Sequence, residues 1–471
     1  MPYKNQSPIE YFGSGLPPFT WILMMVNQFG LNLYLNVNLF VKYGQKTIFF
    51  VVFIFYFFSS NSAISAGIDQ GITDTSIRIG AIMPLTGNTS YDGLDYYSNN
   101  MRRGIEAALE GQVVQGRKID FEVMNDNNDP ITTVQNAREM MDKGIFIMLG
   151  NVGAVSTLKL VRVLEANQIP TMGFFILGDI NANNMLNYRP NPAHEVTKLV
   201  DRFVKDGIKP AQICLFAQND IFGMAGVNGL KTALKKYPDT QSEIDKLDVI
   251  LDMMMGGINP ALNSIGPVGF YQYETVFIRE GYLSLKNWER ENRNQCKLVI
   301  MLAIPKVAAD FIAYSNFKNE PWIYSAISAT AAGYALSNYL NMFSIDKNVV
   351  VSQVVPALES NLPIMVDARK ILGRDLNHVS LEGYIVGRMF ITILKSIKEP
   401  ITRENFVKTA RQKPFDIGGL IIDFTEGNSG SSLVYLSNLK SGSYEAITKD
   451  DISPMDKLQY SHIMNHISLS K

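Results

Sequence analysis

Cysteine and histidine are scarce in this chain of 471 residues. Two cysteines and four histidines occur, and none form a cluster with the spacing of metal ligands. Cys214 lies in an apolar run and is predicted to be a buried core thiol, while a disulfide with Cys296 has no support in the sequence. His462 and His466 share a helical spacing but belong to a polar tail. We therefore expect no metal, no cofactor and no enzyme activity.

Strong net charge and long hydrophobic runs are also missing. The formal net charge is −1 and the chain has no basic block, so nucleic acid is not an expected partner. The apolar block 47–58 has twelve residues, whereas a membrane span needs about 20. With 46% hydrophobic residues and this length, the chain has material for two or three globular domains.

The N-terminal 66 residues have the features of a secretory signal. Lys46 precedes the apolar block, and the small-residue stretch 59–66 follows it, so cleavage is predicted after Ala66. No cysteine stands at this point, which argues against a lipoprotein anchor. Residues 1–45 are too long for a signal, so an unused upstream start with Met24 or Met25 as alternatives, or an uncleaved anchor, stays open.

The mature chain alternates between short apolar strands and amphipathic helices. Strands are predicted at 76–83, 119–124, 145–149, 169–175, 212–216, 297–303, 322–326, 349–355, 420–424 and 433–439, with helices at 101–109, 132–143, 157–164, 195–206, 227–237, 307–317 and 381–397. Each unit takes about 30 residues, as βαβ crossovers do. Two runs of such units, with the Pro/Asn-rich region 181–192 near the first crossing, predict two doubly wound lobes.

The segment 144–157 is the most informative of these units. The apolar run 145–149 is typical of a buried parallel strand, the turn 150–153 breaks it, and a helix begins near Ser156 and Thr157. Such a turn presents free backbone N–H groups at the positive end of a helix dipole, where polar or anionic ligand groups bind. Most βα turns only connect, and this segment alone does not decide between the two interpretations.

A series of short motifs resembles a known family. In order, these motifs are 71–80, Pro84–Gly87, 116–118, 126–130, Gly150–Gly153, 218–223, 351–356, 379–384 and 415–419 with Gly430 and Ser431. Together they resemble the periplasmic substrate-binding proteins of ABC importers, in the branched-chain amino-acid (Leu/Ile/Val) binding family, over roughly residues 71–447.

The resemblance implies an α/β fold of two flavodoxin-like, doubly wound lobes joined by a three-strand hinge, with a ligand cleft between them. Lobe 1 would comprise 71–192 and 357–425, lobe 2 would comprise 193–356 and 426–450, and 451–471 would be a tail. The implied partners are a small-molecule ligand and an ABC permease in the inner membrane, and the implied protein is a periplasmic monomer. A ligand sensor of the same fold that signals to a membrane partner is the alternative, and a permease and ATPase encoded beside the gene would favour import.

The resemblance also places ligand-binding positions on this sequence. The carboxylate-binding serine of amino-acid binders falls on Ala154, and a threonine falls near Leu177. A tyrosine falls near Ile304, and the acidic residue that holds the ammonium falls near Ile327. The candidate ligand-binding residues are Tyr91, Asn151, Val152, Gly153, Ala154, Ser156, Thr157, Phe174, Phe175, Phe222, Tyr271, Ile304 and Ile327.

Loss of the acidic residue changes the expected ligand. An ammonium buried without a carboxylate or several acceptors loses several kcal/mol of hydration. We therefore predict an apolar or aromatic ligand, with a carboxylate that uses backbone N–H groups, rather than free leucine. Phe174, Phe175, Phe222 and Tyr271 would form its wall, although Phe174 and Phe175 are each as consistent with a core position at a strand end.

Overall fold

A computed structural model describes residues 71–86, 93–175, 180, 182–261, 264–331, 333–346 and 348–447. All of them belong to one compact unit, Gly67–Lys471. The predicted signal, Tyr91, Leu177 and the tail with His462 and His466 lie outside the described residues. No helix in the described part of the chain combines the length and the apolar character that crossing a membrane requires.

The first sheet has six strands in the order β2-β3-β1-β4-β5-β6. All neighbours are parallel except β2 with β3, and the parallel five follow the flavodoxin order 2-1-3-4-5. The strands are β1 (Ser76–Met83), β2 (Val113–Val114), β3 (Arg117–Asn125), β4 (Ile147–Leu149), β5 (Thr171–Met172) and β6 (Met185–Leu186). The helices of this run are α3 (Leu94–Leu109), α4 (Pro130–Asp142) and α5 (Val155–Ala166).

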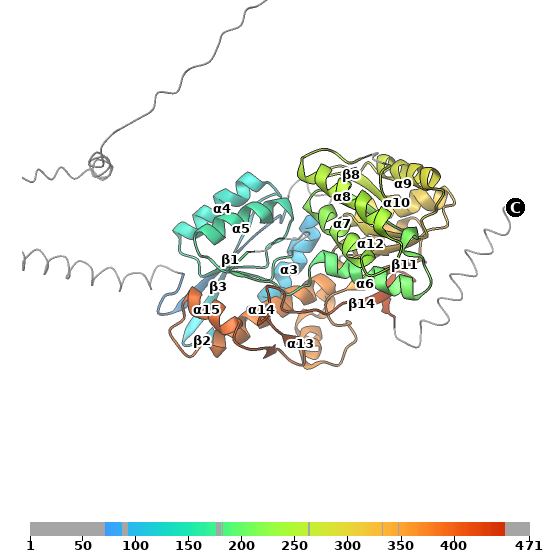
Figure 1. The fold of residues 1–471 in the computed structure, drawn as a ribbon. Coiled ribbons are helices and arrows are strands. Elements are labelled where there is room, and N and C mark those ends of the chain that lie inside the picture. The colour runs from blue at the N-terminus through green and yellow to red at the C-terminus, as the bar shows by residue number, and fades with distance from the viewer. Residues whose placement is uncertain are drawn as a thin grey trace, which may run out of the picture. The chain divides into compact units, whose positions relative to one another are not determined.

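Both faces of the first sheet are covered. On β1, Ile77 and Ile79 join the core that α3 and α14 (His378–Ser396) cover, whereas Ile82 joins the core under α4 and α5. Figure 1 shows α14 beside α3 although they are far apart in the sequence. Glycines permit this approach, because a Cβ on Gly104 would lie 2.0 Å from the Ser380 carbonyl oxygen and one on Gly383 would lie 2.2 Å from that of Met101.

The second sheet has seven strands in the order β15-β14-β11-β10-β9-β7-β8. Its five parallel strands repeat the 2-1-3-4-5 order, and β14 and β15 are added antiparallel. The strands are β7 (Ile213–Asn219), β8 (Val268–Gln272), β9 (Leu298–Leu302), β10 (Ile323–Ala326), β11 (Val349–Gln353), β14 (Tyr435–Lys440) and β15 (Ser443–Ala446). The helices are α6 (Pro192–Lys205), α7 (Ile221–Leu234), α8 (Gln241–Met255), α9 (Arg279–Asn292), α10 (Pro305–Phe317), α11 (Ser328–Ala331) and α12 (Ala335–Met342), with the 3-10 turn η4 (Pro210–Gln212) before β7.

Three chain segments, here called the crossing segments, pass side by side between the two sheets. The first contains Tyr188, the second Val354 and the third Gly430. Backbone bonds join the first to the third, from Gly430 N–H to the Asn187 carbonyl (2.7 Å) and from Ser431 N–H to the Tyr188 carbonyl (3.1 Å). The Tyr188 hydroxyl donates to the Val354 carbonyl of the second segment at 2.8 Å. The remaining elements are α13 (Pro363–Leu372), η5 (Gly373–Asp375), α15 (Arg403–Ala410), β12 (Phe415–Asp416) and β13 (Ile421–Ile422). The predicted fold class is confirmed, while the exact lobe boundaries stay a prediction.

Cys214 is buried as predicted, but it is not a free thiol. Cys214 and Cys296 form a disulfide, with Cα atoms 5.8 Å apart and a sequence separation of 82. The two cysteines meet because β7 and β9 are neighbours and Cys214 is in register with Val299, three residues after Cys296. Sequence spacing alone does not reveal this strand adjacency. A disulfide agrees with a secreted protein, since oxidising compartments preserve such bonds.

Candidate functional site

The turn after β4 has the geometry predicted for it. Gly150 adopts a φ of 77°, and its N–H bonds the Met172 carbonyl at 2.9 Å, so the chain turns sharply after the buried strand. Val152 forms a bridge with Phe175 beside it. Helix α5 begins at Val155, and its N-cap residue Ala154 contributes no side-chain cap. The first backbone N–H groups of α5 therefore have no side-chain acceptor. They form the end of the helix that carries the positive partial charge.

Several buried polar atoms near this turn have no partner among the described residues. They are Asn151 Oδ1, Ser156 Oγ and Asn128 Oδ1, and Ser156 and Asn151 are 1% and 0% exposed. Asn151 is anchored at its other end, since Nδ2 donates to the Ile82 carbonyl at 2.8 Å. Buried polar atoms are normally hydrogen-bonded, so unsatisfied ones point to a missing ligand or water. Thr157 is equally buried, one position further into α5.

The two adjacent predicted phenylalanines, Phe174 and Phe175, lie on different sides of the sheet. Phe174 belongs to the core cluster of Ile82 and Leu160, and is a packing residue. The ring of Phe175 contacts Tyr97 edge-on at 5.0 Å and lies 4.0 Å below the guanidinium of Arg189. Of the two, only Phe175 therefore faces the three crossing segments.

The predicted residues of the second sheet are buried at the ends of its strands. Tyr271 is stacked on Phe216, and its hydroxyl donates to Gln218 Oε1 (2.6 Å) and accepts the N–H of Ile304 (3.1 Å). Ile304 is 7% exposed and Ile327 is fully buried. Tyr271 and Ile304 are thus brought together, but the hydroxyl of Tyr271 is engaged in holding the start of α10.

Phe222 lies in the first turn of α7, and this turn is capped. Asp220 accepts the N–H groups of Phe222 (2.9 Å) and Gly223 (3.3 Å), while Gln218 Nε2 donates to its second oxygen at 2.7 Å. Burial raises the pKa of Asp220 to about 6 against these hydrogen bonds. Asp220 is thus a turn residue, and Phe222 packs in the main core.

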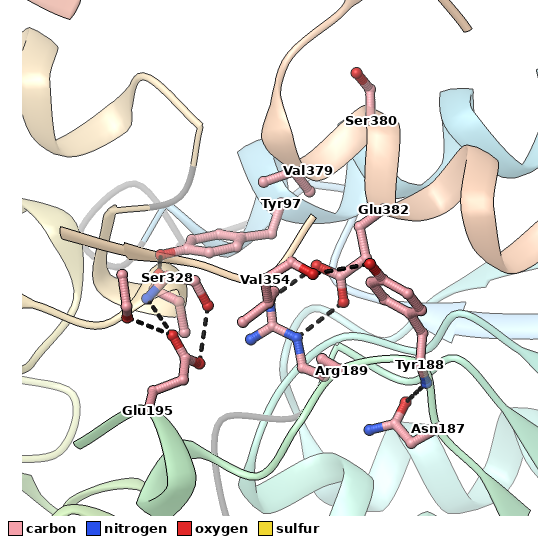
Figure 2. Close-up of polar contacts among 12 residues, drawn as sticks. Tyr97, Asn187, Tyr188, Arg189, Glu195, Ser328, Val354, Val379, Ser380 and Glu382 are labelled. Carbon is pink, nitrogen blue, oxygen red and sulfur yellow. Dashed lines mark hydrogen bonds and ion pairs between the residues drawn. The ribbon is translucent and has the colours of Figure 1, made fainter. Parts of the chain in front are cut away.

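Sequence reasoning missed a buried charge cluster at the crossing segments, here called the hinge cluster and shown in Figure 2. Arg189 donates from Nε and Nη2 to the two oxygens of Glu382, both at 2.8 Å, and the side chains are 2% and 3% exposed. Burial alone would lower the pKa of Arg189, but the charge and hydrogen bonds of Glu382, together with the charge of Glu195, raise the pKa. The hinge cluster comprises Arg189, Glu195, Ser328, Ser352 and Glu382.

Glu195 supplies the second carboxylate of the hinge cluster. It is fully buried and accepts from Ser328 N–H and Ser328 Oγ, both at 2.9 Å, and from Ser352 Oγ at 2.5 Å. Burial raises its pKa, opposed by Arg189 and by the three donors. The signals in the sequence were the isolated Arg189 in a Pro/Asn-rich region and Glu382 inside one of the family motifs. Their pairing spans 193 residues, so no local pattern contains it.

Two hydrogen bonds join the half of the chain built on the first sheet to the half built on the second sheet. The Tyr97 hydroxyl, from the first turn of α3, donates to the Ala329 carbonyl at 2.5 Å close to the hinge cluster. Asn128, in the loop after β3, donates to the Tyr273 hydroxyl after β8 at 3.0 Å. Strands β3 and β8 are distant from the crossing segments in their sheets, so this second bond lies away from the hinge. In the second sheet, β9 and β7 lie between these two contacts in strand order.

Comparison with solved structures identifies this arrangement. The chain superposes with a TM-score of 0.68 on a possible leucine/isoleucine/valine-binding protein from Rhodopirellula baltica, at 24% identity over 80% of this chain and 98% of that one. The chain has the type 1 periplasmic binding fold. A branched-chain amino acid ABC transporter protein from Thermus thermophilus with bound valine matches at 0.61, with 15% identity over 80% and 96% of the two chains.

A further solved structure with this binding fold has a different ligand. An ABC transporter solute-binding protein from R. palustris in complex with 4-hydroxybenzoate matches at a TM-score of 0.59, with 11% identity over 79% of this chain and 96% of that one. A family model described as "Periplasmic binding protein" matches residues 76–238. No match was found among curated proteins by sequence. The chain is thus similar to periplasmic binding proteins in fold, and two of these structural neighbours hold ligands of different classes, valine and 4-hydroxybenzoate.

Proposed function

We propose that this protein captures a small molecule in the periplasm and delivers it to an ABC permease of the inner membrane. The observation that carries the proposal is the uncapped start of α5 beside buried polar atoms without described partners, at the strand ends of a binding fold. Open α/β sheets bind ligands at the carboxyl ends of their strands, and closure of two such halves would sequester the ligand. Cleavage of the N-terminal signal near Ala66 would release the chain on that side of the membrane.

The proposed ligand is an apolar or aromatic acid rather than a free leucine-like amino acid. Ala154, Ile304 and Ile327 stand where amino-acid binders of the family carry polar groups, and none of the three side chains can hydrogen-bond. The carboxylate of Glu195 does contact the turn after β10. It is buried, however, and already accepts three hydrogen bonds from Ser328 and Ser352. An ammonium would therefore lose hydration without gaining an ionic partner.

A carboxylate on the ligand has a receptor in this site. Backbone N–H groups and the dipole at the start of α5 favour an anion without a dedicated cation. Phe175 would offer an aromatic surface next to this turn, since it is bridged to Val152. The bound benzoate derivative in one structural neighbour is an example of an aromatic acid in this fold.

Thermal unfolding of the purified protein in the presence of candidate ligands tests the proposal. The panel comprises leucine, valine, phenylacetate, 4-hydroxybenzoate and 4-methylpentanoate. A ligand at about 100 times its dissociation constant adds about 2.7 kcal/mol of apparent stability, which raises the unfolding temperature measurably. Aromatic and branched acids are expected to shift the transition, and leucine is not. A strong shift with leucine or valine alone would contradict the proposed ligand class.

A further inference from the structure

A small polar corner lies at the start of α5, formed by Asn128, Gly153 and Ser156, and is here called the α5 corner. A Cβ placed on Gly153 would lie 3.6 Å from Asn128 Oδ1 and 3.9 Å from Ser156 Cβ. Gly153 has a φ of 116°, a conformation that other residues rarely adopt, so this position stays without a side chain. The backbone thus leaves space between two polar side chains.

Both of these side chains hold a buried atom without a partner in the described part of the chain. Asn128 Oδ1 and Ser156 Oγ are unsatisfied, and the residues are 9% and 1% exposed. Asn128 is fixed in place by its other groups, since its N–H donates to Asp126 Oδ1 (3.0 Å) and its Nδ2 donates to the Tyr273 hydroxyl (3.0 Å). Asp126 is itself occupied, because Thr133 Oγ1 donates to its second oxygen at 2.7 Å. The α5 corner is therefore polar, and within the described residues neither Asn128 Oδ1 nor Ser156 Oγ is paired.

The electrostatics of the α5 corner select the group that would fill it. An ammonium is disfavoured, since it would stand at the positive end of the α5 dipole. A second carboxylate is disfavoured by the acceptor oxygen of Asn128. A neutral hydroxyl can donate to Asn128 Oδ1 and accept from Ser156 Oγ. Because it both donates and accepts, it would pair with either end of the Asn128 amide.

We propose that the α5 corner binds the hydroxyl of a 2-hydroxy carboxylate whose carboxylate lies on the N–H groups at the start of α5. This inference rests on the proposed function and names the ligand class of the same site. Gly153 immediately precedes the N-cap residue Ala154, so a group at the α5 corner must be attached close to the carboxylate. A hydroxyl on the adjacent carbon meets that requirement. The hydroxyl takes the place that the ammonium has in an amino acid.

Because Asn128 also donates to the Tyr273 hydroxyl, binding of the ligand hydroxyl to Asn128 would affect closure of the two halves as well as affinity. The bond from Asn128 to Tyr273 connects the loop after β3 with the loop after β8, on the side of the site away from the crossing segments. A ligand hydroxyl on Asn128 would therefore stabilise the same side chain that joins the two halves. Binding of the hydroxyl and closure would be coupled through one residue.

Three ligands that differ in one group provide the test. Phenylacetate, mandelate and phenylglycine carry a hydrogen, a hydroxyl and an ammonium on the carbon next to the carboxylate, and calorimetric titration of the purified protein gives their affinities. We expect mandelate to bind about tenfold more tightly than phenylacetate, which is the effect of one or two neutral hydrogen bonds. Phenylglycine is expected to bind more weakly than both. The aliphatic series 4-methylpentanoate, 2-hydroxy-4-methylpentanoate and leucine repeats the comparison.

Variants assign the difference to the α5 corner. Asn128→Gly removes the amide and tolerates the φ of 60° at this residue, and Ser156→Ala removes the second hydroxyl partner. Each is expected to reduce the preference for mandelate over phenylacetate from about tenfold to about twofold. Asn127→Gly is the matched control, because Asn127 is exposed and has a φ of 51°. Tyr273→Phe keeps Asn128 and removes only the hydroxyl that joins it to the other half.

The outcomes separate the two proposals. Equal affinity of wild-type protein for mandelate and phenylacetate would overturn the hydroxyl site and leave the acid-binding function intact. Tightest binding of phenylglycine and leucine would overturn both the hydroxyl site and the proposed ligand class, and so would an absence of binding across both series. A preference for mandelate that survives both Asn128→Gly and Ser156→Ala would also overturn the assignment to the α5 corner.

Discussion

The hinge cluster and the α5 corner are both buried polar regions between the two sheets, but their atoms are satisfied to different degrees. In the hinge cluster, two carboxylates accept five hydrogen bonds from Arg189, Ser328 and Ser352, and Arg189 Nη1 is the atom left without a described partner. In the α5 corner, Asn128 Oδ1 and Ser156 Oγ have no described partner. A satisfied cluster stabilises the fold, whereas an unsatisfied one is available to a ligand.

The largest expected effect is at Arg189. Arg189→Leu would leave the Glu382 carboxylate buried without its partner, and should lower the free energy of unfolding by about 3–5 kcal/mol. Urea denaturation measures this loss in the free energy of unfolding. Arg102→Leu is the control, because its ion pair with Glu106 is about half exposed and should contribute about 0–1 kcal/mol. The double variant Arg189→Leu, Glu382→Leu should recover much of the loss, and equal losses at Arg189 and Arg102 would contradict a structural hinge cluster.

A smaller loss is expected when one donor of the hinge cluster is removed. Ser352→Ala deletes the hydroxyl that donates to Glu195 at 2.5 Å, while the two donors on Ser328 stay. A hydrogen bond to a charged group contributes about 1.5–3 kcal/mol, so unfolding in urea should become easier by about that amount. A change below about 0.5 kcal/mol would show that Glu195 does not depend on this donor.

The capped helix α7 gives a pH-dependent effect of intermediate size. Burial raises the pKa of Asp220 to about 6, against about 3.9 for an unfolded aspartate. The folded chain therefore binds this proton more tightly, so the stabilisation is complete below about pH 4 and is lost as the pH rises through about 6. Asn at this position keeps a capping side chain but does not titrate.

Unfolding curves of wild type and Asp220→Asn at pH 4, 5, 6 and 7 measure this contribution. The stability of wild type relative to Asp220→Asn should fall between pH 4 and 6. Other groups, such as His378 with its pKa lowered to about 4 by burial, cancel because both proteins contain them. A difference that stays constant with pH would show that Asp220 titrates normally.

The smallest expected effect on stability is in the α5 corner. Ser156→Ala removes a hydroxyl that has no described partner, and alanine is the better helix former, so stability should change by less than about 0.5 kcal/mol or rise slightly. It is the same chemical change as Ser352→Ala and is measured in the same way. A loss as large as that of Ser352→Ala would mean that Ser156 is structural, and would remove the contrast between the two regions.

Much of the fold could be predicted from short stretches of sequence. The turn after β4 is an example, because an apolar run, a glycine-containing break and a helical spacing follow one another within 20 residues. Elements between Gln241 and Asn292 were not predicted, since α8, β8 and α9 lie there with weaker local patterns. The second sheet order also needed the structure, because pairing joins strands that are far apart in the chain.

The candidate site was predicted less completely. Asn151 to Thr157 could be found because they share one turn, but Phe174 and Phe175 could not be separated without knowing which side of the sheet each one faces. In the sequence, Asn128 belongs only to the family motif 126–130, and its place near Gly153 follows from contacts between two loops.

By itself, the sequence determined the alternation of strands and helices and the resemblance to a binding family, because hydrophobic period and turn residues are properties of neighbouring positions. Only the tertiary structure decided the disulfide between Cys214 and Cys296, the buried pair of Arg189 and Glu382, and the polar atoms left unsatisfied beside α5. These depend on which distant segments come into contact and exclude water, and the free energy of a polar group depends on the partner found there.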